Sequence, residues 1–498
     1  MSAVFDFVSW ASNKVAPTQP TRRYEAASHS PRMKHWYTPV TDGTSAIQDP
    51  QTIRDRARSL VRDNPWAAKG LNSLVSNSIG FGIRCQIHCK SKTRMAQAQR
   101  LWEQWAETSA CDADGIGDLY HLQALAMRAM VESGEVLIRL RPRRPEDRLP
   151  VPIQLQVIEC DMIADTLQLD QQLANGNTVL RGIEFDTLGR RVAYYLRKRH
   201  PGSPLAYLNP ADYVRVPADE IIHLFRKDRP GQERGVSWFA PVTVTLKELA
   251  QYEDAYLVRQ KLANLMCGFL ISDNPNDFED ELATELPDLS PGTMYALRPG
   301  SQIEFNTPPP AGEDPAYRDS CLRRVAAGLG VTYESLTGDL SSVNFSSARM
   351  GAQEMGRAID GYLWQLFIPR FCNRVFQWFL DAAELQTGLI TTDITAEWTP
   401  PARTIVDPSK EFQSLASAVR NGFITLPEAI RRQGYDPVAV ATEQAEYLAI
   451  LDGLGIKVES DYRNDSKVAV AEAAPQEDDS PTADADDTTQ PGAIDAGD

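Results

Sequence analysis

The sequence predicts an α+β fold that is mainly helical and carries one β-rich region. Apolar residues recur at helical spacing from about Asp49 to Glu132, and again through most of the chain after Pro241. Between about residues 134 and 226 the apolar spacing changes to two, which is typical of short strands. We therefore expect one group of strands with helices before and after it in the chain.

The first 132 residues predict an arm followed by four helices. Residues 1–50 are rich in Pro, Ser, Thr and Arg and have weak periodicity, so we expect an N-terminal arm with one short helix. Asp49 can cap the next helix, Pro50 suits its first turn, and Asn64-Pro65 ends it. A further helix follows up to the glycines near residue 80. Two more are expected at Met95–Thr108 and Leu119–Glu132.

Five short runs with alternating or continuous apolar residues predict the strands. They are GEVLIRLRP, PIQLQVIEC, LRGIEFD, RVAYYLRKR and EIIHLF. Asn175-Gly176 and Gly189 provide turn residues between some of them.

The chain from 241 to 330 predicts two helices that flank a small insert. Pro241 opens a helical stripe that we expect to reach about Ile271, roughly 45 Å long at 1.5 Å per residue. An acidic, proline-rich unit follows to about Pro310, with a strand pair expected in TMYALRPG and QIEFNTP. A shorter helix at about Tyr317–Leu329 then returns along the first.

After Gly330 the sequence VTYESLTGDLSSVNFSSARMG predicts a loop through Asn344. A long aromatic helix is expected from about Ser346 to Glu384, with a kink at Pro369. Short helices are expected over 407–454.

Composition indicates a globular chain with an acidic end. Of 498 residues 42% are hydrophobic, which is enough for sizeable cores. No run approaches the ~18–20 apolar residues of a membrane span, and the first residues lack a secretion signal, so we expect a soluble protein made and used in a cytoplasm. The net charge is -16, and residues 475–498 hold eight acids without Lys or Arg, which predicts a disordered acidic tail.

The seven cysteines predict no disulfide framework, because their number is odd and their spacing irregular. Cys85, His88 and Cys89 form the one cluster, in RCQIHC. A metal site would need a fourth ligand, and the alternative is a strand with small apolar residues.

Several segments together resemble the lambda-type phage portal family, and the resemblance covers roughly Thr21 to Leu454. The strongest is LTGDLSSVNFSSARMG at Leu336–Gly351, preceded by LRRVAAGLGVTYESL. The others, in the family's order, are NPWAAKGLNSLVSNSIGFGI, FRKDRPGQERGVSWFAPV and DPSKEFQSLASAVRNGFITLPEAIRRQGYDP.

The resemblance implies a division of the chain into the parts of a portal. These are an arm at 1–50, a wing at 51–240, stem helix 1 at 241–271, a clip at 272–310, stem helix 2 at 311–330, a tunnel loop at 331–346, a long helix returning to the wing at 347–406, a crown at 407–455 and the acidic tail at 456–498.

The resemblance also implies a function. It implies a ring, a dodecamer in the virion, through which double-stranded viral DNA is packaged and later ejected. The implied partners are the terminase large subunit, a head–tail connector or head completion protein, and the major capsid or scaffold protein. No cofactor, metal or membrane is expected. The alternative is a phage head-assembly adaptor or scaffold-binding protein that forms no channel.

The loop supplies the candidate channel residues. A channel must let a charged rod move, so weak contacts suit it better than arginines and lysines, which bind phosphate tightly. The alternative is a surface loop with ordinary turn chemistry. Arg349 could meet phosphate or pair with Asp339. The candidates that line the channel are Asp339, Ser341, Ser342, Asn344, Ser346 and Arg349.

Two further sets of charged residues each allow two interpretations. Basic residues of the stem helices could steady DNA or simply be structural: Arg318, Arg323, Arg324, Lys247, Arg259 and Lys261. Acids of the clip could dock the motor or connector, or only keep an exposed unit soluble: Asp277, Glu279, Asp280 and Glu281.

Enzyme signatures are missing from the sequence. It contains no G-x-x-x-x-G-K-[ST], G-x-S-x-G or H-E-x-x-H, and its six histidines show no paired ligand spacing. A nuclease using Asp161, Asp165 and Asp339 with magnesium remains as an alternative, although the spacing gives it no specific support. We expect no enzymatic activity.

Overall fold

The computed structural model confirms the α+β class, with helices and antiparallel sheets. Besides the continuous stretches given next, the structure describes four single residues: Thr41, Gly43, Leu173 and Val458. The longer described stretches are 49–165, 176–204, 213–264, 268–272, 301–305, 314–341, 343–403 and 408–456. Among the described helices, none combines the length and apolar character needed to cross a membrane.

The first two predicted helices are present with the caps that the sequence indicated. The α2 helix spans Pro50–Asp63, and the carboxylate of Asp49 accepts a hydrogen bond from the backbone N–H of Thr52. The α3 helix spans Pro65–Ser78, capped by Asn64, whose side-chain oxygen accepts from Trp66 and Ala67. Each cap satisfies N–H groups that the first helical turn leaves without a partner.

Two further helices complete the group of helices that precedes the sheets. They are α4 (Lys92–Ala106) and α5 (Leu119–Ser133), close to the predicted bounds. Trp102 and Trp105 of α4 are fully buried, and Trp102 meets Phe379 edge to face with ring centroids 5.0 Å apart. This aromatic cluster forms part of a large core that runs through most of the described helices.

All five predicted strand runs contain strands, and they form two sheets. In the first, β2 (Glu135–Pro142) lies between β3 (Ile153–Glu159) and β8 (Ile221–Phe225). The second has the order β4-β5-β6-β7, and β7 was not predicted. Its strands are β4 (Thr178–Leu180), β5 (Ile183–Phe185), β6 (Arg191–Arg197) and β7 (Tyr213–Pro217).

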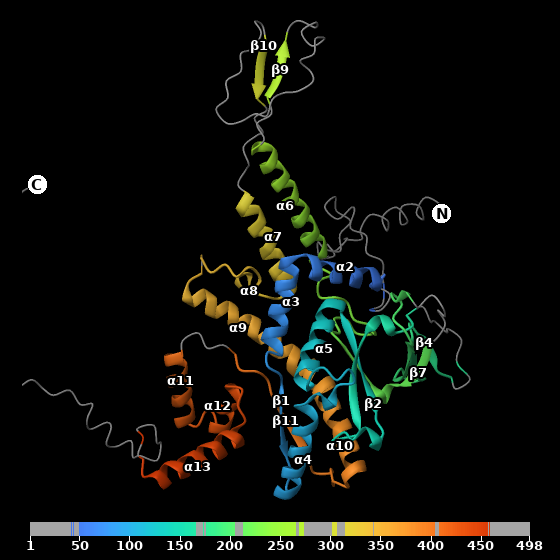
Figure 1. Cartoon of the computed structure of the whole chain (residues 1–498), viewed down its shortest axis with the longest axis vertical. Helices are drawn as coiled ribbons and strands as arrows, with labels where there is room; N and C mark the ends of the chain where they lie inside the picture. Colours follow the sequence, from blue (N-terminus) through green and yellow to red (C-terminus); the bar gives the residue numbers. More distant parts are fainter. Residues whose placement is uncertain are drawn as a thin grey trace, which may run out of the picture. The chain divides into compact units, whose positions relative to one another are not determined.

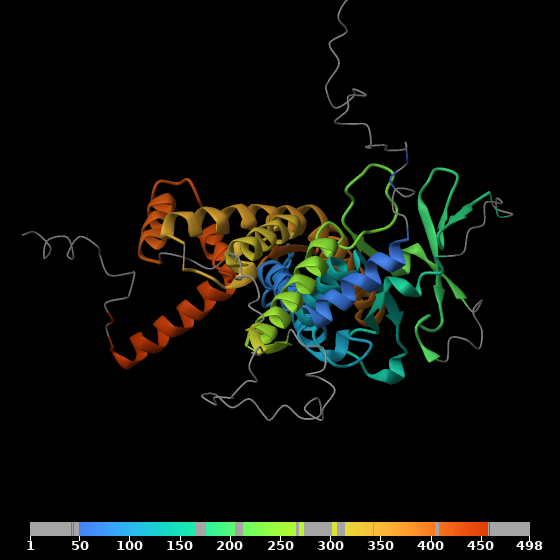
Figure 2. The same ribbon diagram turned by 90° about the horizontal axis from the view of Figure 1, so that it is seen from above.

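The two sheets lie side by side in both views (Figures 1 and 2). A second, smaller core fills the space between them, and Leu137 of β2 packs there against Tyr194 and Leu196 of β6. Because side chains alternate along a strand, the neighbours Val136 and Ile138 point the other way and join the large core.

A buried charge cluster lies where β2 begins. Glu135, with no side-chain exposure, accepts hydrogen bonds from Arg234 at 2.6 and 2.9 Å, from His223 at 3.0 Å and from the backbone N–H of Gly235 at 2.9 Å. The close approach requires glycine, since a Cβ on Gly235 would lie 2.1 Å from the carbonyl oxygen of Gly134. We call Glu135, His223 and Arg234 the buried triad.

The stem prediction needs a correction at its far end. The α6 helix spans Thr243–Asn264 and does not reach Ile271, because Gly268–Ser272 forms the strand β9. Its partner is β10 (Ser301–Phe305) within the predicted run QIEFNTP, whereas TMYALRPG lies outside the described residues. The segment GFLIS starts with glycine and continues with aromatic and β-branched residues, which favour a strand over a helix.

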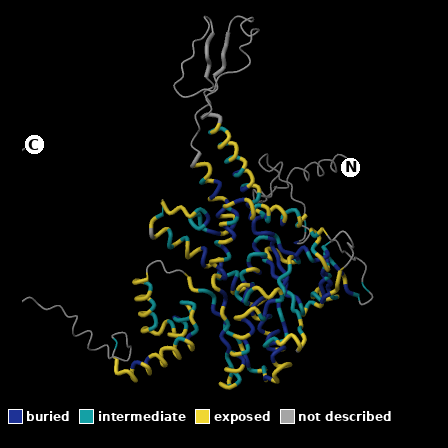
Figure 3. The backbone as a smooth tube through the Cα atoms, viewed as in Figure 1, coloured by how far each residue is buried: buried dark blue, intermediate teal, exposed yellow. Residues whose placement is uncertain are grey.

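The return helix α7 (Asp314–Leu329) agrees with the prediction and packs beside α6 (Figure 1). Tyr252 and Tyr317 meet with ring centroids 4.9 Å apart. At the base of the pair, Leu246 and Leu249 are buried together with Leu322 and Val325. Further along α6, from residue 250 to 261, the side chains are exposed or half-buried and none is buried (Figure 3).

The segment after Gly330 is not a continuous loop, contrary to prediction. Tyr333–Thr337 forms the short helix α8, because Thr332 caps it through Ser335, Leu336 is fully buried, and Gly338 ends it at a φ of 77°. The long helix then follows as α9 (Phe345–Tyr362), a π-helical stretch from Leu363 to Cys372 around Pro369, and α10 (Asn373–Thr387). The wider turns accommodate Pro369, the residue at which the sequence predicted a kink.

The last described elements are short helices, as predicted for 407–454. A strand pair joins β1 (Arg84–His88) to β11 (Thr395–Thr399) before them. The helices α11 (Pro408–Arg420) and α12 (Leu426–Arg432) belong to the first compact unit of the chain, which ends at Gly434. The second unit, described by itself, contains α13 (Pro437–Leu454). The other predicted domain bounds stay predictions.

Candidate functional site

The predicted tunnel loop is a short exposed connection between α8 and α9. Asp339 follows the left-handed Gly338, and its Oδ1 accepts a hydrogen bond from the backbone N–H of Ser341 at 2.9 Å. This bonding from Ser341 lowers the pKa of the Asp339 carboxyl, so the group is ionised at neutral pH. Leu340 beside it is 67% exposed, which its place in the sequence did not indicate.

Asn344 has a local structural task. Its side-chain oxygen accepts from the backbone N–H of Ser347 at 2.8 Å, which caps α9. The carboxamide therefore fixes where the loop ends and the helix begins. Ser341 and Ser346 are exposed, and Ser342 lies outside the described residues.

Arg349 does not pair with Asp339 in this chain. Its Nη2 lies 3.5 Å from Oε1 of Glu411 on α11. The pair sits at the edge of a cleft of about 810 Å³ between α9, the end of β11 and the helices α11 and α12. Arg403, Lys410 and Arg431 also line that cleft. Sequence spacing could not reveal it, since its residues come from segments some 80 positions apart.

The basic residues of the returning helix have partners within the chain. Arg323 lies over the ring of Tyr333 at 5.2 Å, Arg324 donates to Sγ of Cys321 at 3.3 Å, and Arg318 lies 3.8 Å from Asp319. These contacts favour the structural interpretation of Arg323 and Arg324. On α6, Lys247 and Lys261 are exposed. The clip acids Asp277, Glu279, Asp280 and Glu281 lie outside the described residues.

The acids proposed for a magnesium nuclease are not brought together as a site. Asp161 accepts from Arg58 at 2.6 Å and from Arg54 at 3.5 Å, and Asp165 pairs with Arg234 at 2.9 Å. Asp339 belongs to the separate loop described above. Arginines that already neutralise a carboxylate oppose a metal cation at the same oxygens.

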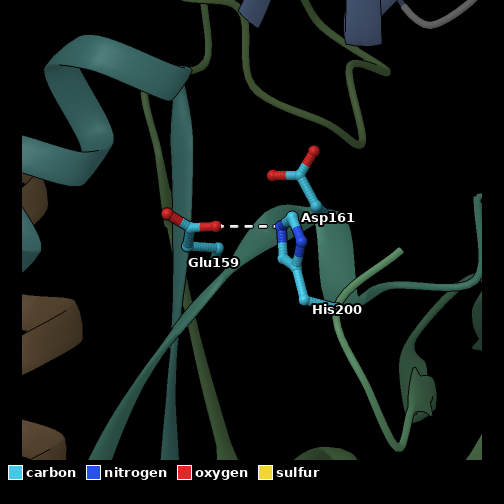
Figure 4. A group of neighbouring side chains, drawn as sticks. All are labelled: Glu159, Asp161 and His200. Atoms are coloured by element: carbon cyan, nitrogen blue, oxygen red, sulfur yellow. Dashed lines mark ion pairs between the residues drawn. The ribbon is translucent and has the colours of Figure 1, made fainter. Parts of the chain in front are cut away.

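One group of side chains has ligand atoms close enough for a metal ion. Glu159, Asp161 and His200 bring their ligand atoms within 4.8 Å of one another, and Nε2 of His200 lies 3.0 Å from Glu159 (Figure 4). Since both oxygens of Asp161 face arginines, we interpret the group as an ion-pair cluster.

The RCQIHC segment forms a strand, as its structural interpretation predicted. Cys85 and His88 point to opposite faces of β1, because they are an odd number of residues apart. Burial raises the pKa of the Cys85 thiol, while His88 pairs with Glu397 at 3.0 Å and Cys89 contacts Asp393. The three side chains therefore have separate partners.

Comparison with known proteins identifies the family. Residues 29–362 match the model described as "Phage portal protein, lambda family". This match covers well over half of the chain, from the end of the arm through the stem, the loop and α9. The chain belongs to the lambda family of phage portal proteins, as the sequence motifs indicated.

Two curated relatives agree with this assignment. The chain is 26% identical over 432 residues to the "Probable portal protein" of Halomonas phage phiHAP-1, covering 82% of each chain. It is 20% identical over 490 residues to "Portal protein B" of Escherichia phage lambda, covering 86% of this chain and 89% of that one. Membership in a portal family agrees with the expectation of a structural, non-enzymatic protein.

Solved structures show a weaker likeness. The neck of the native GTA particle computed with C12 symmetry aligns with a TM-score of 0.47 at 15% identity, covering 77% of this chain and 94% of that one. The HK97 family phage portal protein from Corynebacterium diphtheriae aligns with a TM-score of 0.30 at 12% identity, covering 72% and 98%. These scores are too low to carry an argument about this chain.

Proposed function

We propose that this protein forms the ring at one vertex of a phage capsid through which double-stranded DNA is packaged and later ejected. The observation that carries the proposal is the portal-family match over residues 29–362, which includes both stem helices and the loop. We propose a dodecamer, placed in the virion and assembled in the host cytoplasm, that also nucleates capsid assembly.

Exposed apolar residues on the stem support assembly into a ring. Leu257 and Val258 of α6 are 52% and 54% exposed, and Val244 is 68% exposed. Within one copy these side chains face solvent, whereas Leu246 and Leu249 at the base of α6 are buried. Apolar side chains that one copy leaves exposed on α6 can be covered by a neighbouring copy, and a repeated head-to-tail contact of this kind can close around an axis.

The composition of the loop supports a channel in which DNA moves. Residues 337–346 contain no Lys or Arg, and the ionised Asp339 repels phosphate. Ser341 and Ser346 offer exposed hydroxyls for weak contacts. We propose that the loop, with Asp339, Ser341, Ser342, Asn344, Ser346 and Arg349, faces the narrowest part of the bore.

The proposed partners follow from the same role. They are the terminase large subunit, a head–tail connector or head completion protein, and the major capsid or scaffold protein. The clip acids Asp277, Glu279, Asp280 and Glu281 stay the predicted docking residues for the motor and connector.

Two experiments test the proposal in sequence. Negative-stain microscopy of the purified full chain should show large rings with a central hole, whereas small globules would favour the adaptor that forms no channel. Removing residues 339–344 should then leave the rings intact and impair DNA packaging or retention in a complementation assay. Rings that package and retain DNA normally without this segment would refute the assignment of the loop.

A further inference from the structure

Three arginines at one side of β2 line two adjoining hollows in the wing, and the larger hollow reaches the second sheet. Arg139 and Arg141 occupy alternate positions of β2, and Arg143 follows directly after the strand. All three lie on the face on which Leu137 packs in the smaller core. Two hollows of about 300 and 380 Å³ share Arg139, Arg141 and Gln156, and Arg143 lines the smaller one. We call this site the arginine cleft.

Within the described part of the chain, none of the three arginines forms an ion pair. Arg141 donates to the neutral amide oxygen of Gln156 at 2.8 Å, and Arg143 donates to that of Gln154 at 2.6 Å. The Nε of Arg139 is buried and makes no hydrogen bond. Glu220 also lines the cleft but does not come within ion-pair distance.

Several other arginines of the wing pair with carboxylates. Arg58 pairs with Asp161 at 2.6 Å, Arg215 with Glu184 at 2.7 Å, and Arg234 with Glu135 at 2.6 Å. In the arginine cleft, by contrast, burial together with the charges of Arg139 and Arg143 lowers the pKa of Arg141. Holding like charges together in a recess is unfavourable unless an anion joins them, so the cluster indicates a ligand with negative charges.

The spacing of the arginines favours a peptide. Alternate residues of a strand are about 7 Å apart, and an extended acidic peptide repeats its carboxylates at the same interval. Residues 475–498 contain two such pairs, Glu477 with Asp479 and Asp484 with Asp486, and no basic residue. A DNA duplex is too wide to enter hollows of this size, so its phosphates could reach only their rim.

We propose that the arginine cleft binds an acidic peptide with alternating carboxylates, and that its occupant is segment 475–498 of a neighbouring copy. The choice of a neighbouring copy rests on the proposed ring, whereas binding of the peptide itself does not. Guanidinium groups hold carboxylates through paired, charge-assisted hydrogen bonds, so the segment would tie adjacent wings together. It would also keep these arginines from binding DNA phosphates during packaging.

The test uses a full-length variant in which the eight acids of 475–498 are replaced by Asn or Gln, so that the cleft is free. A fluorescent peptide with the natural sequence 475–498 is titrated into it at low salt, and anisotropy is recorded. Saturable binding is expected, and R139Q/R141Q should weaken it by roughly tenfold or more, as expected for the loss of charge-assisted hydrogen bonds.

A matched variant controls for net charge. K92Q/R100Q removes two exposed positive charges from α4, outside the cleft, and should bind the peptide like the parent. The thermal unfolding midpoint of R139Q/R141Q should stay the same or rise, because the substitutions relieve repulsion. Equal affinity in R139Q/R141Q and K92Q/R100Q would overturn the proposal. The proposal would also be overturned if a short DNA duplex displaced the peptide at concentrations below those at which the peptide binds.

Ring formation is recorded on the same samples by negative stain. If rings form but the peptide does not bind, this inference is wrong and the proposed function is unaffected. If the peptide binds but no rings form, the arginine cleft is supported as a peptide site and the proposed ring is contradicted.

Discussion

The regions that the family resemblance predicts to be the wing and the stem differ in how completely one copy satisfies its own side chains. In the wing, Trp102 and Trp105 are buried and the charge of Glu135 is fully paired. In the stem, Leu257 and Val258 on the outer part of α6 are half exposed. The wing is therefore stabilised mainly by contacts within one chain, whereas we infer that the stem depends on contacts with other copies.

The largest effect is expected from breaking the buried triad. Glu135→Ala removes the carboxylate that pairs with Arg234 and leaves a buried guanidinium without its main partner. We expect unfolding to become easier by about 3–5 kcal/mol, measured by chemical denaturation. Asp63→Asn, which alters an exposed pair with Arg62, is the control and should leave the denaturation midpoint unchanged. A small loss in Glu135→Ala would show that the wing does not depend on this charge cluster.

The same triad should make stability fall on acidification. Burial lowers the pKa of His223 to about 4 from 6.5, and Arg234 and His223 hold the pKa of Glu135 low even though burial alone would raise it. Between pH 6.5 and about 4, His223 is protonated in the unfolded chain and neutral in the folded chain. The free energy of unfolding should therefore be unaffected by His223 above pH 6.5. It should fall as the pH drops toward 4, by up to about 1.4 kcal/mol per pH unit.

Denaturation midpoints measured from pH 7 to 4 check this expectation. His223→Gln keeps a hydrogen-bond donor near Glu135 but cannot titrate, so its profile should be flatter over that window. An equally steep profile in this variant would assign the acid sensitivity to other groups.

A smaller effect is expected at the start of α9. Asn344→Ala removes the side-chain acceptor for the N–H of Ser347 and should lower stability by about 1 kcal/mol. Asn344→Asp keeps an acceptor at the cap and should restore most of the loss. Thermal unfolding of the two variants side by side is the measurement, and equal midpoints would mean that the cap has no role in fixing the end of the loop.

The smallest effect on stability, but a clear effect on assembly, is expected in the stem. Leu257→Ala together with Val258→Ala removes apolar groups that one copy leaves exposed, so the unfolding midpoint of the dissociated chain should hardly change. Ring formation, followed by light scattering after size exclusion, should weaken. Full assembly of this variant would contradict the proposed packing of stem helices between copies.

Local signals in the sequence predicted many elements correctly. Asp49 and Asn64 cap α2 and α3 as expected, because a cap depends on residues at most three positions away. Pro369 was expected to disturb the long helix, and a π-helical stretch surrounds it. The errors at Ile271 and at Tyr333–Thr337 arose where packing decided the outcome, through the pairing of β9 with β10 and the burial of Leu336.

The sequence by itself determined the α+β class, the order of most elements and, through its motifs, the portal family, since these depend on periodicity and on runs of neighbouring residues. Only the tertiary structure decided that Arg349 meets Glu411, that Glu135 is buried against Arg234, and that the arginines of β2 line hollows in which they form no ion pair with a described residue. Such contacts join residues far apart in the chain, and charge interactions are set by distance and burial, which residue spacing does not encode.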